Sequence, residues 1–395
     1  MISFAFSEEQ QLLRRSIREF LEKELRPVSA ETDRDARFPA ETIAKMGGAG
    51  YLGTIVPEKY GGAGFGKVEY CILMEEIGRV DASVATILGA HSSLGSSALL
   101  YYGNEQQKQL YLRQAAAGEK IISFNLSEPE AGSDAKSIKT TAVRDGSCFR
   151  ISGSKMWATN GREAGIFIVF ARTGGRGAEG ITAFIVERGA KGLTFGREED
   201  KMGIRGSSTM QLFYDDVVVD GGNVLGGVGN GFKVAMTSLD VGRLSLSAAS
   251  LGMAGRAIEL AISHARRRVQ FGRPIGELQA IQFKLADMGM RSRALHYLVY
   301  ATASRADGLG PNPAEWKRSD REEMTRDCAI AKCSASETAS FCVDESLQIH
   351  GGIGFTKSSE IERHYRDARI YEIYEGTNEI QRLLIGRDMI GRGWQ

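Results

Sequence analysis

Several features are scarce in this chain of 395 residues, and each scarcity narrows the protein classes that fit it. Its five cysteines are odd in number and form no Cys-x-x-Cys pair; they are Cys71, Cys148, Cys328, Cys333 and Cys342. This usage indicates reduced thiols in a cytoplasm-like compartment and argues against a disulfide framework. The five histidines show no His-x-x-x-His or Cys/His spacing, so we expect no metal site.

Long apolar runs and a strong charge imbalance are also lacking. No run approaches the roughly 20 apolar residues of a membrane-spanning helix. The first residues, Met1 to Ser7, lack a basic stretch followed by an apolar core, so they resemble neither a secretory signal nor a transit peptide. The net charge of +1 gives no hint of nucleic-acid binding, although it leaves room for a local basic patch. We expect no membrane or nucleic-acid partner, and a cytoplasmic location of the bacterial type, or the mitochondrial matrix if a transit peptide has been removed.

The length of the chain exceeds the usual limit of a single hydrophobic core, so two or three domains are expected. Residues 1–120 are predicted to form an α-helical domain. Ser7 to Gln10 fit a capping box, and an apolar face then continues until Pro27, where we expect the first helix to stop. A further helix is expected from Glu105, after the turn at Gly103-Asn104.

The periodicity of the sequence changes twice after this region. Between residues 121 and 230, about seven short β-prone runs with turn signals predict a β-barrel or sandwich. One of the turns is the hairpin signal Asp145-Gly146. From residue 231 to 395, long helical segments return at 232–268, 277–306 and 321–350, which predicts an antiparallel α-helical bundle.

The C-terminal stretch Tyr374-Glu375-Gly376-Thr377 is a loop that opens into an amphipathic helix. Thr377 is a natural N-cap, and Gly376 gives the backbone freedom that a β-carbon would deny. One interpretation is that Glu375 complements the positive end of the helix. The other is that this carboxylate performs chemistry, and the residue pattern alone does not choose between them.

Several motifs in order resemble the acyl-CoA dehydrogenase family over nearly the whole chain. The stretch from Arg363 to Arg382, with its Tyr-Glu-Gly-Thr centre, is similar to the C-terminal signature of that family, above all to its short-chain, butyryl-CoA branch. The resemblance implies an α-domain, a β-barrel and a C-terminal four-helix bundle. It also implies that Glu375 is the base that removes the α-proton of an acyl-CoA thioester, with a flavin as hydride acceptor.

The chemistry itself requires such a cofactor, because no side chain accepts a hydride. The sequence has no Gly-x-Gly-x-x-Gly after a strand, which disfavours a nicotinamide on a Rossmann unit. Without the family, the segment from Phe124 to Asp134 reads as a strand and loop, and Trp157 as a core residue. Both resemble flavin-binding boxes of the family, and the resemblance implies FAD contacts at Phe124, Leu126, Ser127, Ser133, Trp157, Ala158 and Thr159.

A second set of FAD contacts is implied for the cofactor of a neighbouring subunit. Arg268-x-x-Phe271-Gly-x-Pro resembles a loop whose arginine reaches the FAD diphosphate, a role that suits a planar guanidinium. From the residue pattern alone, the Arg268 segment is a basic helix end and the segment after Gln348 is a glycine C-cap. The further implied FAD contacts are Gln279, Gln348, Gly351, Gly352, Thr377, Asn378 and Glu379. Because two of these boxes serve a neighbour's cofactor, we expect a homotetramer built as a dimer of dimers.

The acyl-CoA site implied by the resemblance includes the first long helix. Its predicted contacts are Ser133, Asp240, Val241, Gly242, Arg243, Glu375 and Gly376. In the isovaleryl and long-chain branches a glutamate occupies the place of Gly242 and replaces the loop base, so its absence here agrees with an intact Glu375. The backbone N–H of Glu375 and a flavin hydroxyl would polarise the thioester.

The predicted activity is therefore dehydrogenation of a short- or branched-chain acyl-CoA to the trans-2-enoyl-CoA, in fatty acid or amino acid catabolism. An electron-transferring flavoprotein would take the electrons. Two alternatives stay open. A glutaryl-CoA dehydrogenase is disfavoured because no arginine follows Gly78-Arg79-Val80-Asp81 within the next few residues. A DNA-associated flavoprotein of the same fold would need a basic face or a C-terminal extension.

Overall fold

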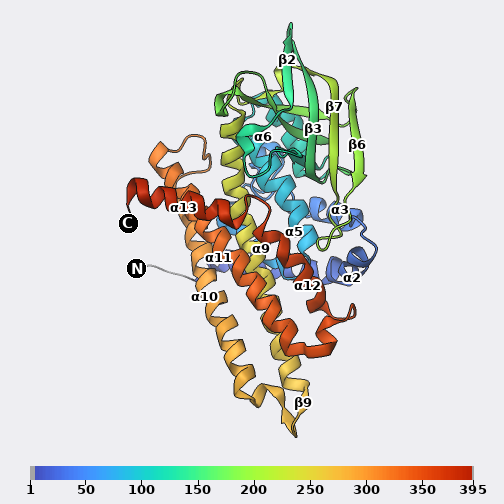
Figure 1. The fold of residues 1–395 in the computed structure, drawn as a ribbon, viewed down its shortest axis with the longest axis vertical. Coiled ribbons are helices and arrows are strands. Elements are labelled where there is room, and N and C mark those ends of the chain that lie inside the picture. Colours follow the sequence, from blue (N-terminus) through green and yellow to red (C-terminus); the bar gives the residue numbers. More distant parts are fainter. Residues whose placement is uncertain (1–4, 394–395) are drawn as a thin grey trace.

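The computed structural model describes residues 5–393, and its chain passes from helices to strands and back to helices. The targeting prediction made for the N-terminus rests partly on residues 1–4, which lie outside this range. Figure 1 shows the sheet at one end of the molecule and the long helices running away from it, with the hairpin strand β9 at the opposite tip. Among the helices of residues 5–393, none is both long and apolar enough to cross a membrane.

The N-terminal helices are α1 (Glu8–Glu24), α2 (Arg26–Arg34), α3 (Ala40–Gly48), α4 (Lys67–Gly78), α5 (Ala82–Leu88), α6 (Ser97–Tyr102), α7 (Glu105–Gln107) and α8 (Arg113–Ala116). Two π-helical segments, η2 (Gly89–Ser96) and η3 (Lys108–Leu112), join α5 to α6 and α7 to α8. The predicted capping box at Ser7 is present, and Asn104 caps the helix predicted after it. Pro27 does not end α1, which stops at Glu24; it lies in the first turn of α2, where its missing N–H leaves no bond unmade.

The strands are β1 (Ile122–Asn125), β2 (Thr141–Asp145), β3 (Cys148–Thr159), β4 (Ile166–Arg172), β5 (Ile181–Glu187), β6 (Leu193–Glu198), β7 (Thr209–Asp220) and β8 (Val224–Leu225). They form one eight-stranded sheet in the order β6-β7-β3-β2-β4-β5-β8, with β1 paired in parallel with β4. The Asp145-Gly146 hairpin joins β2 to β3 as predicted. Two of the β-prone runs, one starting at Met210 and one at Val217, belong to one long strand, β7.

The C-terminal helices are α9 (Gly231–Arg267), α10 (Gln279–Gly308), α11 (Arg318–His350), α12 (Glu360–Ala368) and α13 (Asn378–Arg392). Strands β9 (Val269–Gln270) and β10 (Arg273–Pro274) form a separate hairpin between α9 and α10. Two 3₁₀ segments, η8 (Gly351–Phe355) and η9 (Arg369–Glu372), flank α12. The remaining 3₁₀ turns lie at Glu58–Tyr60, Ala135–Ser137, Ala178–Gly180, Gly221–Asn223 and Ile275–Glu277. The three long helices agree with the predicted segments to within a few residues.

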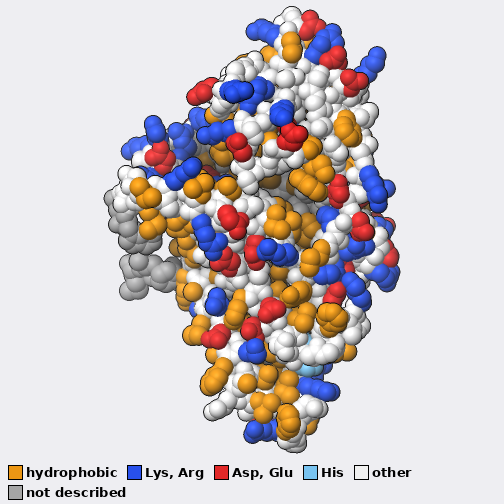
Figure 2. Space-filling model, in the orientation of Figure 1, with side chains coloured by type: hydrophobic (Ala, Val, Ile, Leu, Met, Phe, Trp, Pro, Cys, Tyr) orange, Lys and Arg blue, Asp and Glu red, His pale blue; other side chains and the backbone are white. Residues whose placement is uncertain are grey.

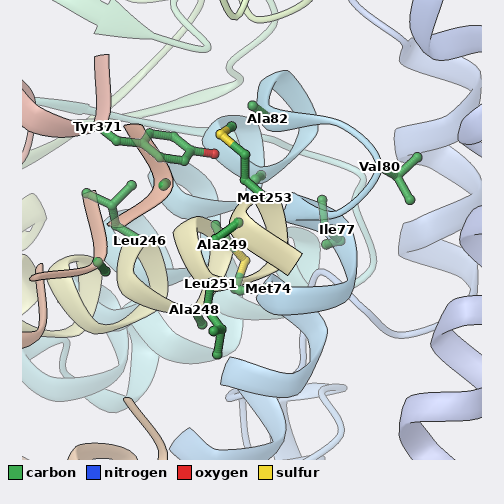
Figure 3. Close-up of a cluster of buried hydrophobic side chains, with 14 of the residues drawn as sticks. Met74, Ile77, Val80, Ala82, Leu246, Ala248, Ala249, Leu251, Met253 and Tyr371 are labelled. Atoms are coloured by element: carbon green, nitrogen blue, oxygen red, sulfur yellow. The ribbon is translucent and has the colours of Figure 1, made fainter. Parts of the chain in front are cut away.

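The N-terminal and C-terminal helices share one hydrophobic core. Figure 3 shows side chains of α4, such as Met74 and Ile77, among side chains of α9. The two helices approach so closely that a β-carbon at Gly252 would lie 1.9 Å from the carbonyl oxygen of Glu75. Because α9 is held from both sides, by α4 and α11, the residues that it carries near its middle have fixed positions.

Candidate active site

The candidate base sits in a turn with unusual backbone geometry. Glu375 has a φ of 55° and Gly376 a φ of 88°, so two consecutive residues are left-handed. For a non-glycine residue this conformation costs about 1–3 kcal/mol and persists only where the surroundings enforce it. Thr377 caps α13 as predicted, with its side chain accepting a hydrogen bond from the N–H of Ile380. We call residues 374–377 the Glu375 turn.

Side chains from three helices donate hydrogen bonds to the carbonyl oxygens of this turn. Arg243 Nε of α9 donates to the carbonyl of Glu375 at 3.3 Å. Gln381 Nε2 of α13 donates to the carbonyls of Glu375 and Gly376, at 3.1 and 2.9 Å. Lys332 Nζ of α11 donates to the carbonyl of Gly376 at 2.9 Å. These bonds enforce the left-handed turn. Neither Lys332 nor Gln381 was predicted as a site residue; the signal that could have indicated Lys332 is a lysine on an otherwise apolar helix face.

The carboxylate of Glu375 is buried without a hydrogen-bond partner. Although the residue keeps some exposed surface, Oε2 is closed to solvent and makes no hydrogen bond to any residue of 5–393. Burial raises the pKa of Glu375 to about 7, while Arg243 and Lys332 act in the opposite direction. A carboxyl with a pKa near neutrality suits a general base, whereas a solvated helix-end charge would have an ordinary pKa. The environment therefore favours the chemical interpretation of Glu375.

The predicted acyl-CoA residues of α9 lie beside this carboxylate. A β-carbon at Gly242 would stand 2.3 Å from Glu375 Oε2. Arg243 Nη1 donates to Asp240 Oδ1 at 2.7 Å, and Thr325 of α11 donates to Asp240 Oδ2 at 2.6 Å. Ser133 lies in an exposed loop. Lys136 of the same loop packs over the ring of Phe232 at the start of α9.

A cavity of about 320 Å³ adjoins these residues, between α9, the ends of α10 and α11, and the loop before α11. Val241, Leu244 and Trp316 give it apolar walls, and Asp240 faces it. Its other lining includes the cations Lys67, Lys233 and Arg321, none of which forms an ion pair with a carboxylate within residues 5–393. The cavity thus combines apolar walls with an excess of basic side chains, since Lys67, Lys233, Arg318 and Arg321 line it together with Asp240 and Glu322.

A second group of predicted residues meets at the edge of the sheet. Ser127 accepts a backbone hydrogen bond from Met156 at 2.9 Å, so the loop after β1 runs beside the end of β3. The register of β3 against β7 shifts between Lys155 and Ala158. This bulge leaves Met156 and Trp157 without partner residues in β7. Trp157 has a φ of 61° and remains 57% exposed. A bulge of this kind redirects a side chain out of the sheet.

The hydroxyl groups here are free for a ligand. Within residues 5–393, the side-chain oxygens of Ser127 and Thr159 make no hydrogen bond to another residue. Phe124 packs on Phe170, and Ala158 and Leu126 are buried, so these three could meet a ligand mainly through their backbone. An exposed aromatic ring beside unused hydroxyls and strand-end backbone groups fits the ring of a flavin.

The third group lies at the opposite tip of the molecule, by the β9–β10 hairpin (Figure 1). Phe271 and Gly272 form its two-residue turn with φ of 53° and 74°, and the ring of Phe271 is 90% exposed. The ends of α9 and α11 meet here, with the rings of His264 and His350 4.5 Å apart. Arg268, Gln279, Gln348, Gly351 and Gly352 are all exposed in this region.

The single chain therefore does not bring this third group to Trp157. The side chain of Asn378 is also turned away from solvent: it donates to Ser336 Oγ at 3.0 Å and accepts from Lys332 at 2.8 Å. A contact between Asn378 and a cofactor would have to use its backbone. No group of three or more His, Cys, Asp or Glu side chains within residues 5–393 is arranged to hold a metal ion.

Comparison with known proteins covers nearly the whole chain. Residues 7–119, 123–217 and 229–390 match the models of the N-terminal, middle and C-terminal domains of acyl-CoA dehydrogenase. An acyl-CoA dehydrogenase of Bacillus subtilis is 42% identical over 386 residues, which cover 98% of this chain and 99% of that protein. The human mitochondrial short-chain specific acyl-CoA dehydrogenase is 42% identical over 389 residues, 98% of this chain and 92% of that protein.

Solved structures agree with this picture. Butyryl-CoA dehydrogenase from Megasphaera elsdenii has a TM-score of 0.93 at 40% identity, covering 98% of this chain and all of that one. An acyl-CoA dehydrogenase from Bacillus anthracis complexed with FAD has a TM-score of 0.91 at 36% identity, covering all of this chain and 69% of that one. A chain from the structure of the electron transferring flavoprotein of Acidaminococcus fermentans has a TM-score of 0.93 at 40% identity, covering 98% of this chain and all of that one.

Proposed function

Because the chain belongs to the acyl-CoA dehydrogenase family, we propose that it oxidises a short-chain acyl-CoA to the trans-2-enoyl-CoA with Glu375 as the base. The family makes the protein an FAD-dependent oxidoreductase that acts on acyl-CoA thioesters. The preference for a short acyl chain rests on the human and Megasphaera relatives.

One observation carries the proposal: the buried, unpartnered carboxylate oxygen of Glu375 beside the empty side-chain position of Gly242. In this arrangement the carboxylate takes the α-proton of the thioester, and the backbone N–H of Glu375 donates to the thioester carbonyl. Such a donor, aimed at an oxygen that gains charge, contributes about 3–4 kcal/mol. Within residues 5–393 the N–H of Glu375 donates no hydrogen bond to another backbone group, so it is available to the thioester.

FAD supplies the hydride acceptor for the β-hydrogen of the substrate. Ser127 and Thr159 would hold it through hydroxyls that the fold leaves unused, and Trp157 would cover it with a ring that the bulge exposes. The cavity beside Asp240 would receive part of the CoA moiety, whose phosphates suit Lys233 and Arg321.

A panel of saturated acyl-CoA thioesters of rising chain length, with an artificial electron acceptor, tests this function. We expect the highest kcat/KM with butyryl-CoA or a close neighbour, and trans-2-enoyl-CoA as the product. If no saturated acyl-CoA bleaches the bound flavin, the proposed activity is wrong.

The same panel tests the cavity when it includes butyryl-pantetheine, which lacks the nucleotide. Arg321→Gln should raise KM for butyryl-CoA and leave KM for butyryl-pantetheine nearly unchanged. Equal effects on both thioesters would mean that Arg321 does not contact the CoA nucleotide.

We further propose a homotetramer, a dimer of dimers, in which the third group serves the FAD of a neighbouring subunit. The apolar side chains Val269, Phe271, Phe283, Ile353 and Phe355 are 52% to 90% exposed at this end. Figure 2 shows hydrophobic side chains gathered there, and a second copy of the chain would cover them. An electron-transferring flavoprotein is the proposed acceptor of the electrons, supported by the Acidaminococcus structure.

Arg268→Ala is expected to weaken FAD retention while the fold survives, because the side chain is exposed and forms no hydrogen bond or ion pair within residues 5–393. Gel filtration, sedimentation and flavin absorbance before and after dialysis measure assembly and retention together. Arg176→Ala, in an exposed loop of the β region, is the matched control. Unchanged FAD affinity in Arg268→Ala would contradict its role, and a fully active monomer would contradict the tetramer.

A further inference from the structure

Lys332 is a buried lysine on α11 that has no role in the reaction proposed above. Its side chain is fully buried, as are Cys328, Ala331 and Ala335 of the same helix. Its Nζ donates to the carbonyl of Gly376 at 2.9 Å and to Asn378 Oδ1 at 2.8 Å. No carboxylate of residues 5–393 lies within ion-pair distance of it.

A buried ammonium without a paired carboxylate opposes folding, so a neutral donor would serve better if only the hydrogen bonds mattered. Gln381 shows that an amide suffices to hold the same carbonyl of Gly376, at 2.9 Å. The positive charge of Lys332 therefore calls for a second role. Of the two carboxylates whose charge acts on Lys332, Glu375 has the larger effect and Glu372 the smaller.

The charged and titratable groups around this pair come from several elements. Arg243 of α9 faces both residues, and it is already engaged with Asp240. On the side of Lys332 stand Cys333 of α11 and Glu372 of η9, and on the side of Glu375 stand Tyr70 of α4, Tyr371 and Tyr374. Burial lowers the pKa of Lys332 to about 8, so the ammonium is charged in the range where Glu375 ionises.

We propose that Lys332 is a positioning residue whose buried ammonium fixes the Glu375 turn and keeps the Glu375 carboxylate ionised and ready to accept a proton. The inference rests on the proposed role of Glu375. Its hydrogen bonds set the backbone of Gly376 and the start of α13 through Asn378. Its charge acts on Glu375 through a region that excludes water, where electrostatic interactions are strong.

Two variants test whether the charge of Lys332 acts on Glu375. Lys332→Met removes both and keeps the length of the side chain, whereas Lys332→Arg keeps the charge. Lys284→Met is the control, because Lys284 of α10 forms an ion pair with Glu345 of α11, the helix that carries Lys332, but lies away from the turn. The measurement is the single-turnover rate of flavin reduction by butyryl-CoA from pH 5.5 to 9.

We expect Lys332→Met to move the acid limb of this profile upward by about one unit, which lowers the rate on that limb about tenfold. Lys332→Arg should keep the position of the limb even if the rate falls, and Lys284→Met should match the wild type. A limb that stays in place in Lys332→Met, or that moves equally in Lys332→Arg, overturns the inference.

A second readout does not depend on turnover. The infrared band of the protonated Glu375 carboxyl is identified by its absence in Glu375→Gln, and its titration gives the pKa directly. It should titrate higher in Lys332→Met than in the wild type. If the wild type itself shows neither this band nor an acid limb, the proposed role of Glu375 fails; if only the Lys332 variants show no change, the inference about Lys332 fails.

Discussion

Glu375→Gln is expected to lower the rate of flavin reduction by substrate by at least about 10²–10⁴-fold, the usual loss for a missing general base. The substitution keeps the size of the side chain, the backbone N–H and the carbonyl bonds to Arg243 and Gln381. Flavin content and acyl-CoA binding should therefore survive. Anaerobic stopped-flow absorbance gives the rate, and titration of the flavin spectrum with a substrate analogue gives the binding.

The pH dependence of the wild type provides an independent check. The base must be ionised to accept a proton, so the rate should rise with pH through about 7, the pKa that burial gives Glu375. In Glu375→Gln the residual rate should lose this limb. A near-normal rate in the variant, or a limb that persists unchanged, would identify another residue as the base.

The same substitution should change stability in a direction opposite to its effect on activity. Burial raises the pKa of Glu375 from 4.5 to about 7, so the folded chain binds the proton more tightly than the unfolded chain. Stability contributed by the protonated form is complete below pH 4.5 and is lost as the pH rises through about 7. Glu375→Gln removes this loss, so its melting temperature should exceed that of the wild type at pH 8 and match it at pH 4.5.

Local signals in the sequence predicted the parts of the fold that depend on neighbouring residues. The cap at Ser7, the cap at Thr377 and the Asp145-Gly146 hairpin each need only a few adjacent residues, and the structure contains all three. Pro27 shows the limit of such signals, because a proline can equally open the next helix. The order of the strands, with β1 beside β4, was not predictable from periodicity.

The candidate site also has parts that local motifs predicted and parts that they did not. The motifs identified Glu375, and the structure gives it a buried carboxylate with a raised pKa. The motifs also indicated Arg243, as a substrate contact, but not that Arg243, Lys332 and Gln381 converge on one turn from three helices. The bulge that exposes Trp157 likewise depends on the register between β3 and β7, which are far apart in sequence.

Gly242→Val is expected to abolish most of the activity while flavin binding survives. A β-carbon at position 242 would lie 2.3 Å from Glu375 Oε2 and 2.8 Å from Leu94 Cδ2, so even the first added atom displaces the carboxylate. Overpacking of this kind typically costs about 1–3 kcal/mol of stability. Because a misplaced catalytic group can lower a rate 10²-fold, we expect a loss of at least about that size. Steady-state kinetics and flavin absorbance separate the two effects, and Gly289→Val, at an open position of α10, is the control.

The short distance between position 242 and the Glu375 carboxylate also decides which double variants can carry the base at position 242. Other branches of the family carry a glutamate at the position of Gly242, so Gly242→Glu is the substitution to test as a replacement for Glu375. Combined with Glu375→Gln it should fail, because the glutamine amide would occupy the space that the new β-carbon needs. Combined with Glu375→Gly the space is free, and part of the lost rate should return. Equal activity of the two double variants would show that the steric argument at Gly242 is wrong, whereas recovery in the glycine pair alone would establish that one site admits one carboxylate.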